Sequence, residues 1–192
     1  AKILRAGCVE NQKRLIYASS GSTYGSGEHG FDDDSSRGYL GKLKPLNTYA
    51  WSKCAFDYYV ARTLHRREPQ PLQSAGLKFF NVYGPNEYHK GDQQSVITRI
   101  FPHAKADRPV HLFKSYNTQY KDGAQRRDFI YVKDCVSVVL WLLDNPKVSG
   151  LFNIGTGTAR TFDDLAKGAL RQASFVDSAM DPGASMIPIC QH

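Results

Sequence analysis

A tyrosine and a lysine four residues apart, Tyr49 and Lys53, are the residues of this chain best suited to acid–base chemistry. They stand at the start of a segment that we predict to be helical, where such positions share one face about 6 Å apart. A phenol has a pKa near about 10, but a neighbouring ammonium favours the phenolate and lowers that pKa. The pair is therefore a candidate proton-transfer device. An ordinary amphipathic helix can carry the same spacing, so other features must decide.

Composition places the chain among globular proteins. It has 192 residues, of which 41% are hydrophobic and 22% charged, enough for one domain or part of a larger one. The net charge is +7, but the basic residues are scattered, which disfavours nucleic acid and suits a small anionic substrate such as a nucleotide diphosphate. No apolar run approaches the ~20 residues of a membrane helix, so we expect no membrane association. Residues 1–5 do not form a signal peptide and include no initiator Met, so we expect the sequence to begin inside a longer protein.

The four cysteines are far apart and form no Cys-x-x-Cys pair. Cys54 and Cys135 fall inside predicted helices, whereas Cys8 and Cys190 lie near the two ends. This pattern favours reduced thiols in a cytoplasmic protein over disulfides, and it predicts no metal site.

Strand and helix patterns alternate along the chain, which predicts an α/β fold with a mostly parallel sheet. We expect Asn47, Asp134 and Thr161 with Asp164 to cap three helices, and Pro102 to kink another. The predicted helices are the end of one over 3–12, then 47–67, 94–106, 135–143 and from Thr161 to about 173. The predicted strands are 14–19, 76–82, 110–113, 127–132 and 151–154.

Three short motifs have an ordinary structural explanation beside a functional one. Gly155-x-Gly157 follows a strand, but Arg160 stands where a dinucleotide loop needs its third glycine, so we favour a tight turn. The serines at 19–22 end a strand, where a hydroxyl could donate to a substrate oxygen or simply shape a turn, and no nucleophile elbow surrounds them. The run 126–128 (Arg-Arg-Asp) could bind a diphosphate, although a surface ion pair is the simpler interpretation.

Five segments occur in a characteristic order: 17–25 (Tyr-Ala-Ser-Ser-Gly-Ser-Thr-Tyr-Gly), Tyr49-x-x-x-Lys53, 80–85 (Phe-Asn-Val-Tyr-Gly-Pro), 127–134 (Arg-Asp-Phe-Ile-Tyr-Val-Lys-Asp) and 153–157 (Asn-Ile-Gly-Thr-Gly). Together they resemble the extended short-chain dehydrogenase/reductase superfamily, which includes sugar-nucleotide epimerases and dehydratases. His89-Lys90-Gly91 and Leu-Phe-Lys-Ser at 112–115 narrow the resemblance to the branch that epimerises ADP-heptose at carbon 6. The resemblance covers roughly residues 5–173.

The resemblance implies a role for each matching residue. Ser20 would hydrogen-bond the reacting oxygen, Tyr49 would be the catalytic tyrosine, and Lys53 would bind the nicotinamide ribose and lower the pKa of Tyr49. Lys90 would be a second acid/base group and, with Val82, would contact the cofactor. The residues implied to contact the sugar nucleotide are Asn81, Asp92, Arg99, Phe113, Lys114, Ser115, Tyr116 and Arg127.

The chemistry of the family explains why two acid/base groups are expected. A carbinol C–H is not acidic, so the family passes hydride to bound NADP, forms a transient ketone at carbon 6 and returns hydride to the opposite face. Because the two faces differ, our hypothesis assigns one group to each, Tyr49 and Lys90. The implied cofactor is NADP, with NAD possible. The implied partners are ADP-heptose or a similar sugar nucleotide and, in a full-length protein, further copies of the chain.

The chain departs from the family in its extent. Only 48 residues precede Tyr49, too few for the glycine-rich first βαβ unit that binds the dinucleotide. We therefore predict a partial Rossmann-like, doubly wound parallel sheet over 1–173, interleaved with substrate-binding segments at 85–126 and 158–173. The segment 174–192 is an unassigned tail. We expect the chain alone to be inactive. The alternatives are another NAD(P)-dependent sugar-nucleotide epimerase or dehydratase, or a non-catalytic remnant.

Overall fold

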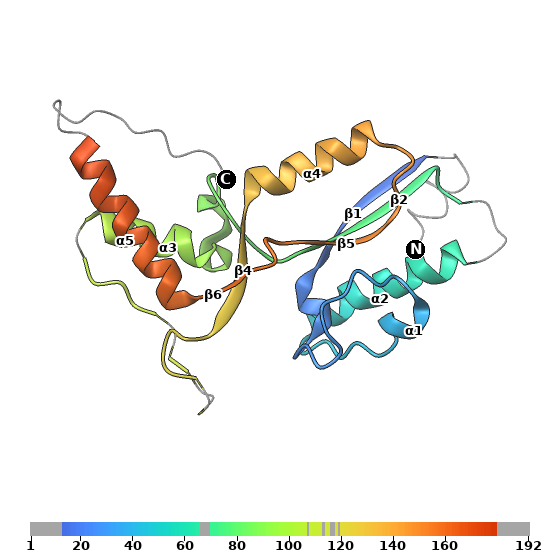
Figure 1. Cartoon of the computed structure of the whole chain (residues 1–192), viewed down its shortest axis with the longest axis horizontal. Helices are drawn as coiled ribbons and strands as arrows, with labels where there is room; N and C mark the ends of the chain where they lie inside the picture. Colours follow the sequence, from blue (N-terminus) through green and yellow to red (C-terminus); the bar gives the residue numbers. More distant parts are fainter. Residues whose placement is uncertain are drawn as a thin grey trace. The chain divides into compact units, whose positions relative to one another are not determined.

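The computed structural model describes two compact units, each made of two stretches of chain (Figure 1). Unit 1 comprises Ala1–Val82 and Ile130–Thr156, and unit 2 comprises Tyr83–Phe129 and Gly157–His192. The described residues are 13–65, 70–106, 108–112, 114, 115, 118 and 120–179, with side chains described up to 172. The helix predicted over 3–12 lies outside them.

A three-stranded parallel sheet forms the centre of unit 1. Its order is β1 (Arg14–Ser20), β2 (Gln73–Phe79) and β5 (Gly150–Ile154). The predicted strands 14–19 and 151–154 are confirmed, as is the parallel α/β class. The predicted strand 76–82 is wrong as one element: it spans the end of β2 and a separate β3 (Asn81–Tyr83). Because parallel strands share one direction, the carboxyl ends of all three meet at one edge.

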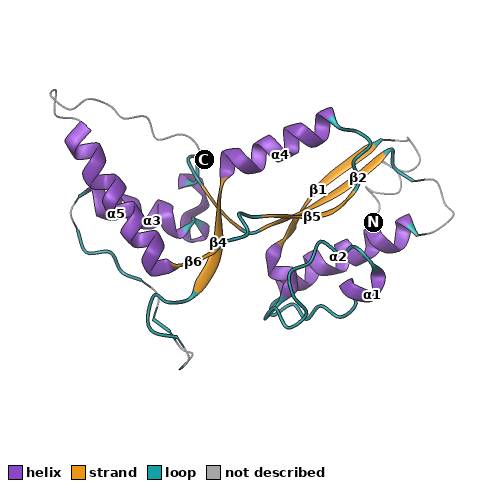
Figure 2. Ribbon diagram, viewed as in Figure 1, coloured by secondary structure: helices purple, strands orange, loops and turns teal. Residues whose placement is uncertain are grey.

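Two helices cover the opposite faces of this sheet, α2 (Thr48–Leu64) and α4 (Val132–Asp144) (Figure 2). Side chains alternate between the faces along β2. Ala75 and Leu77 pack with buried α4 residues, whereas Lys78 faces Asp57 of α2. The side under α4 is therefore mainly apolar, with Gln73 hydrogen-bonded to the end of α4, whereas the side under α2 contains buried charge.

The start of α2, which carries Tyr49 and Lys53, is fixed by its predicted cap. The Asn47 side-chain oxygen accepts a hydrogen bond from the Ala50 amide at 2.8 Å. The helix buries Ala50 and Val60 among other side chains and ends at Leu64, shortly before the predicted end at residue 67. Cap and apolar face together hold the first turn against the sheet.

The predicted cap of α4 is wrong. The N-cap position is Tyr131, and Asp134 instead lies in the first helical turn. Val132 and Lys133 already adopt helical conformation, so the helix begins earlier than the apolar run. Asp134 still interacts favourably with the positive end of the helix dipole.

A second sheet joins β3, β4 (Arg126–Tyr131) and β6 (Ala159–Thr161) in the order β3-β4-β6. The predicted strand 127–132 is confirmed as β4, which pairs antiparallel with the short, unpredicted β6. In unit 2, α3 (Val96–Lys105) packs on α5 (Phe162–Ala179) through Ile100, Ala166 and Ala169. The helix predicted over 94–106 is thereby confirmed, and it runs through Pro102.

The capping box of α5 is confirmed, although its predicted end is wrong. The Asp164 amide donates to the Thr161 hydroxyl at 2.9 Å, and the Thr161 amide donates to Asp164 at 3.2 Å. The helix continues past residue 173 to Ala179, so part of the predicted tail is helical.

The strand predicted over 110–113 is also wrong in its described part. Val110 and Leu112 belong to no strand and pack against the apolar cluster between α3 and α5. The alternating apolar residues therefore serve to pack on two helices, and they do not pair with another strand. The short elements α1 (Arg37–Leu40), η2 (Gly21–Tyr24) and η3 (Tyr88–Gln93) have too few residues to show a period and were not predicted.

Candidate active site

Ser20 is the last residue of β1, at the carboxyl edge of the parallel sheet. Its hydroxyl accepts a hydrogen bond from the Ser22 amide at 3.2 Å and lies 2.9 Å from the Ser22 hydroxyl. Gly25 closes the following turn with φ +64°, where a side chain would collide with the Lys44 carbonyl. The turn therefore depends on glycine and holds the Ser20 hydroxyl at the sheet edge.

Tyr49 and Lys53 lie on the first turns of α2, which packs against β1 and η2. The Lys53 ammonium lies 5.7 Å from the centre of the Tyr49 ring and donates to the Ala18 carbonyl at 2.9 Å. Tyr49 is 57% exposed. The structure thus brings Lys53 beside both Tyr49 and the strand that ends in Ser20, and leaves the phenol open to solvent.

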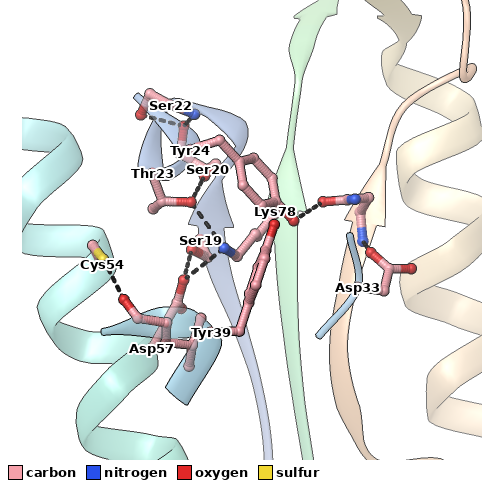
Figure 3. A network of polar contacts seen from close by, with 12 residues as sticks. Ser19, Ser20, Ser22, Thr23, Tyr24, Asp33, Tyr39, Cys54, Asp57 and Lys78 are labelled. Carbon is pink, nitrogen blue, oxygen red and sulfur yellow. Dashed lines mark hydrogen bonds and ion pairs between the residues drawn. The ribbon is translucent and has the colours of Figure 1, made fainter. Parts of the chain in front are cut away.

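A buried polar network adjoins Ser20 at the end of β1 (Figure 3). The Lys78 ammonium donates to the Thr23 hydroxyl at 2.9 Å and lies 3.8 Å from an Asp57 carboxylate oxygen. The same Asp57 oxygen accepts a hydrogen bond from Ser19 at 2.7 Å. Burial raises the pKa of Asp57 and lowers the pKa of Lys78, and the attraction between them opposes both shifts only in part.

Two other tyrosines of unit 1 have no comparable access to a substrate. Burial, then the Asp57 charge, raises the pKa of Tyr17 well above its ordinary value. Burial also raises the pKa of Tyr24, whose hydroxyl contacts the Asp32 carbonyl at 2.9 Å and the Asn153 side-chain oxygen at 2.7 Å. Both phenols therefore stay protonated, and Tyr49 is the exposed one of the three.

Lys90 lies in η3 of unit 2, where it pairs with Glu87 at 3.3 Å. Glu87 is almost completely buried and also accepts hydrogen bonds from the Gly84 amide, the Ser95 amide and hydroxyl, and Thr98. Burial raises the pKa of Glu87, but these hydrogen bonds together lower it to about 2. Glu87 is therefore a fixed anion at the base of the Lys90 loop. Because Tyr49 belongs to unit 1, the pairing of Tyr49 with Lys90 stays a prediction.

The predicted substrate residues of unit 2 lie on its surface. Arg99 donates to the Asp92 carbonyl, and its guanidinium lies 3.8 Å from the Asp92 carboxylate. The Ser115 amide donates to Asp122 at 2.6 Å, and Arg127 donates to the Arg126 carbonyl at 2.7 Å. Lys114 is exposed, and Phe113 and Tyr116 lie outside the described residues.

Asn81 and Val82 follow β2 in the short strand β3. Asn81 is exposed, whereas Val82 lines an apolar pocket of about 340 Å³ beside Phe79 and the Val136 and Leu140 side chains of α4. Val82 thus lies on the α4 side of the sheet, and its predicted contact with a cofactor stays a prediction.

Unit 2 contains a larger pocket, of about 620 Å³, between aromatic side chains and the α5 helix. The cationic side chains of Arg160, Lys167 and Arg171 line this pocket, and none of the described residues predicted to bind substrate lines it.

The turn at Gly155-x-Gly157 is followed by a strand. The Gly157 amide donates to Asp128 at 2.8 Å, and β6 rather than a helix comes next. The tight-turn interpretation of Gly155-x-Gly157 therefore agrees with the structure.

Sequence reasoning missed four residues that support the site, namely Thr23, Asp57, Lys78 and Glu87. Two of them had a visible signal. Lys78 interrupts an apolar run in a strand predicted to be buried, and Asp57 lies one helical turn after Lys53. Charged residues are rarely buried without a partner, so each position could have been predicted to need one.

The comparison with protein families settles which group of proteins this is. The NAD dependent epimerase/dehydratase family matches residues 1–155. The chain belongs to this family. That membership agrees with the parallel sheet, with its carboxyl edge at Ser20, and with the Tyr49–Lys53 pair on the adjoining helix.

Individual relatives narrow the similarity. An ADP-L-glycero-D-manno-heptose-6-epimerase of Nitratidesulfovibrio vulgaris is 51% identical over 164 residues, covering 85% of this chain and 49% of the relative. One of Fusobacterium nucleatum is 48% identical over 171 residues, covering 89% and 50%. The solved Helicobacter pylori enzyme of the same name is 29% identical with a TM-score of 0.63, covering 85% and 47%. The chain spans about half the length of the curated relatives that it matches.

The family description implies a nicotinamide cofactor, and the described residues fit one end of it. Lys53 and Tyr49 lie side by side at the carboxyl edge of the parallel strands, where α/β sheets bind ligands. The spacing Gly-x-Gly-x-x-Gly occurs at 25–30, but η2 separates it from β1 and no helix begins directly after Gly30, so it is not the strand-turn-helix arrangement that binds the pyrophosphate in such sheets. The binding of the nicotinamide ribose by Lys53 stays a prediction, and no dinucleotide loop of this kind is found among the described elements.

Proposed function

We propose that this chain is the part of an ADP-heptose epimerase that supplies the acid/base residues. The reaction would convert ADP-D-glycero-D-manno-heptose to ADP-L-glycero-D-manno-heptose by transient oxidation and re-reduction at carbon 6. The observation that carries the proposal is the Lys53 ammonium, held between the Tyr49 ring at 5.7 Å and the strand that ends in Ser20. The relatives of 48–51% identity support the choice of sugar nucleotide.

The three site residues of unit 1, Ser20, Tyr49 and Lys53, each have a separate role in this proposal. Tyr49 would accept the proton of the carbon-6 hydroxyl as that carbon is oxidised, with the Lys53 ammonium held beside its ring. The Ser20 hydroxyl donates to the same oxygen and holds it in place. NADP, or NAD, would supply the chemistry of hydride acceptance and return.

Lys90 is the proposed second acid/base group. Epimerisation returns hydride to the other face of the ketone, so a proton must then reach the oxygen from a differently placed donor. The Lys90 side chain is 44% exposed, and its ammonium pairs with Glu87 at 3.3 Å, so an ammonium with three donors can also reach a ligand. Asn81, Asp92, Arg99, Lys114, Ser115 and Arg127 would contact the ADP-sugar.

Substitution in a full-length epimerase that carries this sequence tests the assignment. Tyr49→Phe keeps the ring and removes the proton-transferring oxygen, and Lys90→Met keeps the chain length and removes the charge. We expect each to lower kcat by about 10²–10⁴-fold. Tyr59→Phe, on the same helix, is the matched control and should keep its activity. Near-normal epimerisation by either catalytic variant would show that the assignment is wrong.

A binding experiment on the chain itself separates this proposal from a non-catalytic remnant. We expect weak NADP binding, measured by cofactor fluorescence, because the Gly-x-Gly-x-x-Gly spacing at 25–30 is not followed directly by a helix that could bind the pyrophosphate. Tight, micromolar binding would show that the chain is a working dinucleotide-binding fragment. A full-length protein should bind NADP and exist as a homo-oligomer, which light scattering can measure.

A further inference from the structure

Lys78 is a charged residue in a place where an apolar one would pack. Its side chain is 1% exposed, in the middle of a three-stranded sheet covered by helices on both faces. Its contacts are the Thr23 hydroxyl, the Asp57 carboxylate and the face of the Tyr24 ring, 4.1 Å from the ammonium (Figure 3). Burying an ion pair commonly costs more than it returns in stability. The presence of the buried Lys78–Asp57 pair is therefore not explained by a gain in stability.

Thr23 links this ammonium to the Ser20 backbone. An ammonium can only donate, so the Thr23 hydroxyl must accept from Lys78 at 2.9 Å. The single Thr23 proton is then directed to the Ser20 carbonyl, which lies at 2.8 Å. Thr23 is completely buried, so water does not compete for either bond. The charge on Lys78 thus fixes the direction of two successive hydrogen bonds, from Lys78 to Thr23 and from Thr23 to the Ser20 carbonyl.

Asp57 links the Lys78 ammonium to α2, the helix that carries Tyr49 and Lys53. It follows Lys53 by four residues, which places both side chains on one face of α2. Asp57 accepts from Ser19 at 2.7 Å, and Lys53 donates to the Ala18 carbonyl at 2.9 Å. Two consecutive residues of β1 are thereby bonded to two consecutive turns of α2, immediately before Ser20.

We propose that Lys78 is a positioning residue for catalysis, which sets Ser20 through Thr23 and is itself held to α2 by Asp57. The network fixes the Ser20 hydroxyl relative to the helix that presents Tyr49 and Lys53. It touches neither substrate nor cofactor. The inference rests on the proposed function, because it gives Ser20 and Tyr49 a shared task.

Thr23→Val tests the link with the smallest change, since valine has nearly the shape of threonine and lacks the hydroxyl. In a full-length epimerase that carries this sequence, we expect kcat to fall about 10–100-fold while KM stays within about twofold. Thr23→Ser restores the hydroxyl and should restore most of kcat. The control is Thr63→Val, which removes a similar hydroxyl on α2 that donates to the Tyr59 carbonyl at 2.9 Å. That control should leave both constants unchanged.

A second measurement uses the chain without its ligands. Amide hydrogen exchange should show the Ser22 and Gly25 amides about tenfold faster in Thr23→Val, because the turn they close loses its anchor. The same amides should keep their rates in Thr63→Val and Thr23→Ser.

The outcomes separate this inference from the proposed function. Full kcat in Thr23→Val alongside a large loss in Tyr49→Phe would overturn the positioning role alone. A loss in Thr23→Ser as large as in Thr23→Val would also overturn it, because the hydroxyl would then not be what matters. Full kcat in Tyr49→Phe would overturn the proposed function itself.

Discussion

Each unit has a lysine–carboxylate pair at a proposed catalytic group: in unit 1 it supports Ser20, and in unit 2 its lysine is itself the proposed acid/base group. The two pairs differ in surroundings rather than in chemistry. In unit 1 the Lys78 and Asp57 side chains are both almost completely buried, 3.8 Å apart. In unit 2 Glu87 is buried but Lys90 is 44% exposed, at 3.3 Å. The pKa of Asp57 is raised, whereas that of Glu87 is lowered to about 2.

The number of hydrogen-bond donors explains the difference. Glu87 receives four hydrogen bonds from Gly84, Ser95 and Thr98 in addition to the Lys90 ammonium, and these outweigh the cost of burial. For Asp57, the hydrogen bonds from Ser19 and Tyr17 and the charge of Lys78 lower the pKa, but together they do not outweigh the effect of burial. A buried ion pair alone therefore does not stabilise an anion, while a full set of donors does.

The largest expected effect is on Lys78→Met. Removing one partner of a buried pair leaves the Asp57 charge without compensation, and we expect a loss of about 3–5 kcal/mol in the free energy of unfolding. Urea denaturation of the chain measures it. Adding Asp57→Leu should recover most of that loss, because no buried charge then remains. A double variant as unstable as the single one would show that the lysine stabilises the fold by its packing rather than by its charge.

A smaller effect is expected for Glu87→Gln. The amide replaces one acceptor oxygen with a donor that faces other donors, so we expect a loss of about 1.5–3 kcal/mol at pH 7. Because the folded pKa of about 2 lies below the ordinary value of 4.5, this stabilisation is present above pH 4.5 and is lost as the pH falls toward 2. Melting temperatures from pH 7 to pH 2 should converge for the two proteins. A constant gap across that range would contradict the assigned pKa.

Asp57 should behave in the opposite way in acid. Its raised pKa means that the folded protein holds the proton more tightly than the unfolded chain does. Ionised Asp57 therefore costs stability, and that cost is relieved as the pH falls. In the Asp57→Asn variant this offsetting gain is absent, so the net loss of stability in acid should be steeper than in the parent, which a matched pH series can measure.

The contrast between the units also shows what a sequence can and cannot predict. Strand β1, helix α2 and the Thr161 capping box follow from local signals, namely an apolar run, an Asn cap and a four-residue motif. The residues around Val110 have an apolar alternation that packs on helices instead of pairing as a strand. Partners such as Thr23 and Lys78, 55 residues apart, depend on the register between β1 and β2, which no local pattern encodes.

We expect the smallest effect on stability from Lys44→Met, which serves as an exposed reference for the two buried or half-buried pairs. Lys44 pairs with Glu28 at 3.1 Å, closer than Lys78 to Asp57, yet both side chains are more than half exposed. Water solvates the two charges almost as well apart as together, so the short distance adds little stability. We expect the melting temperature to stay within experimental error, and 0.5 M salt to leave the difference unchanged. A loss comparable to that of Lys78→Met would mean that distance, rather than burial, governs how much a lysine–carboxylate pair matters in this protein.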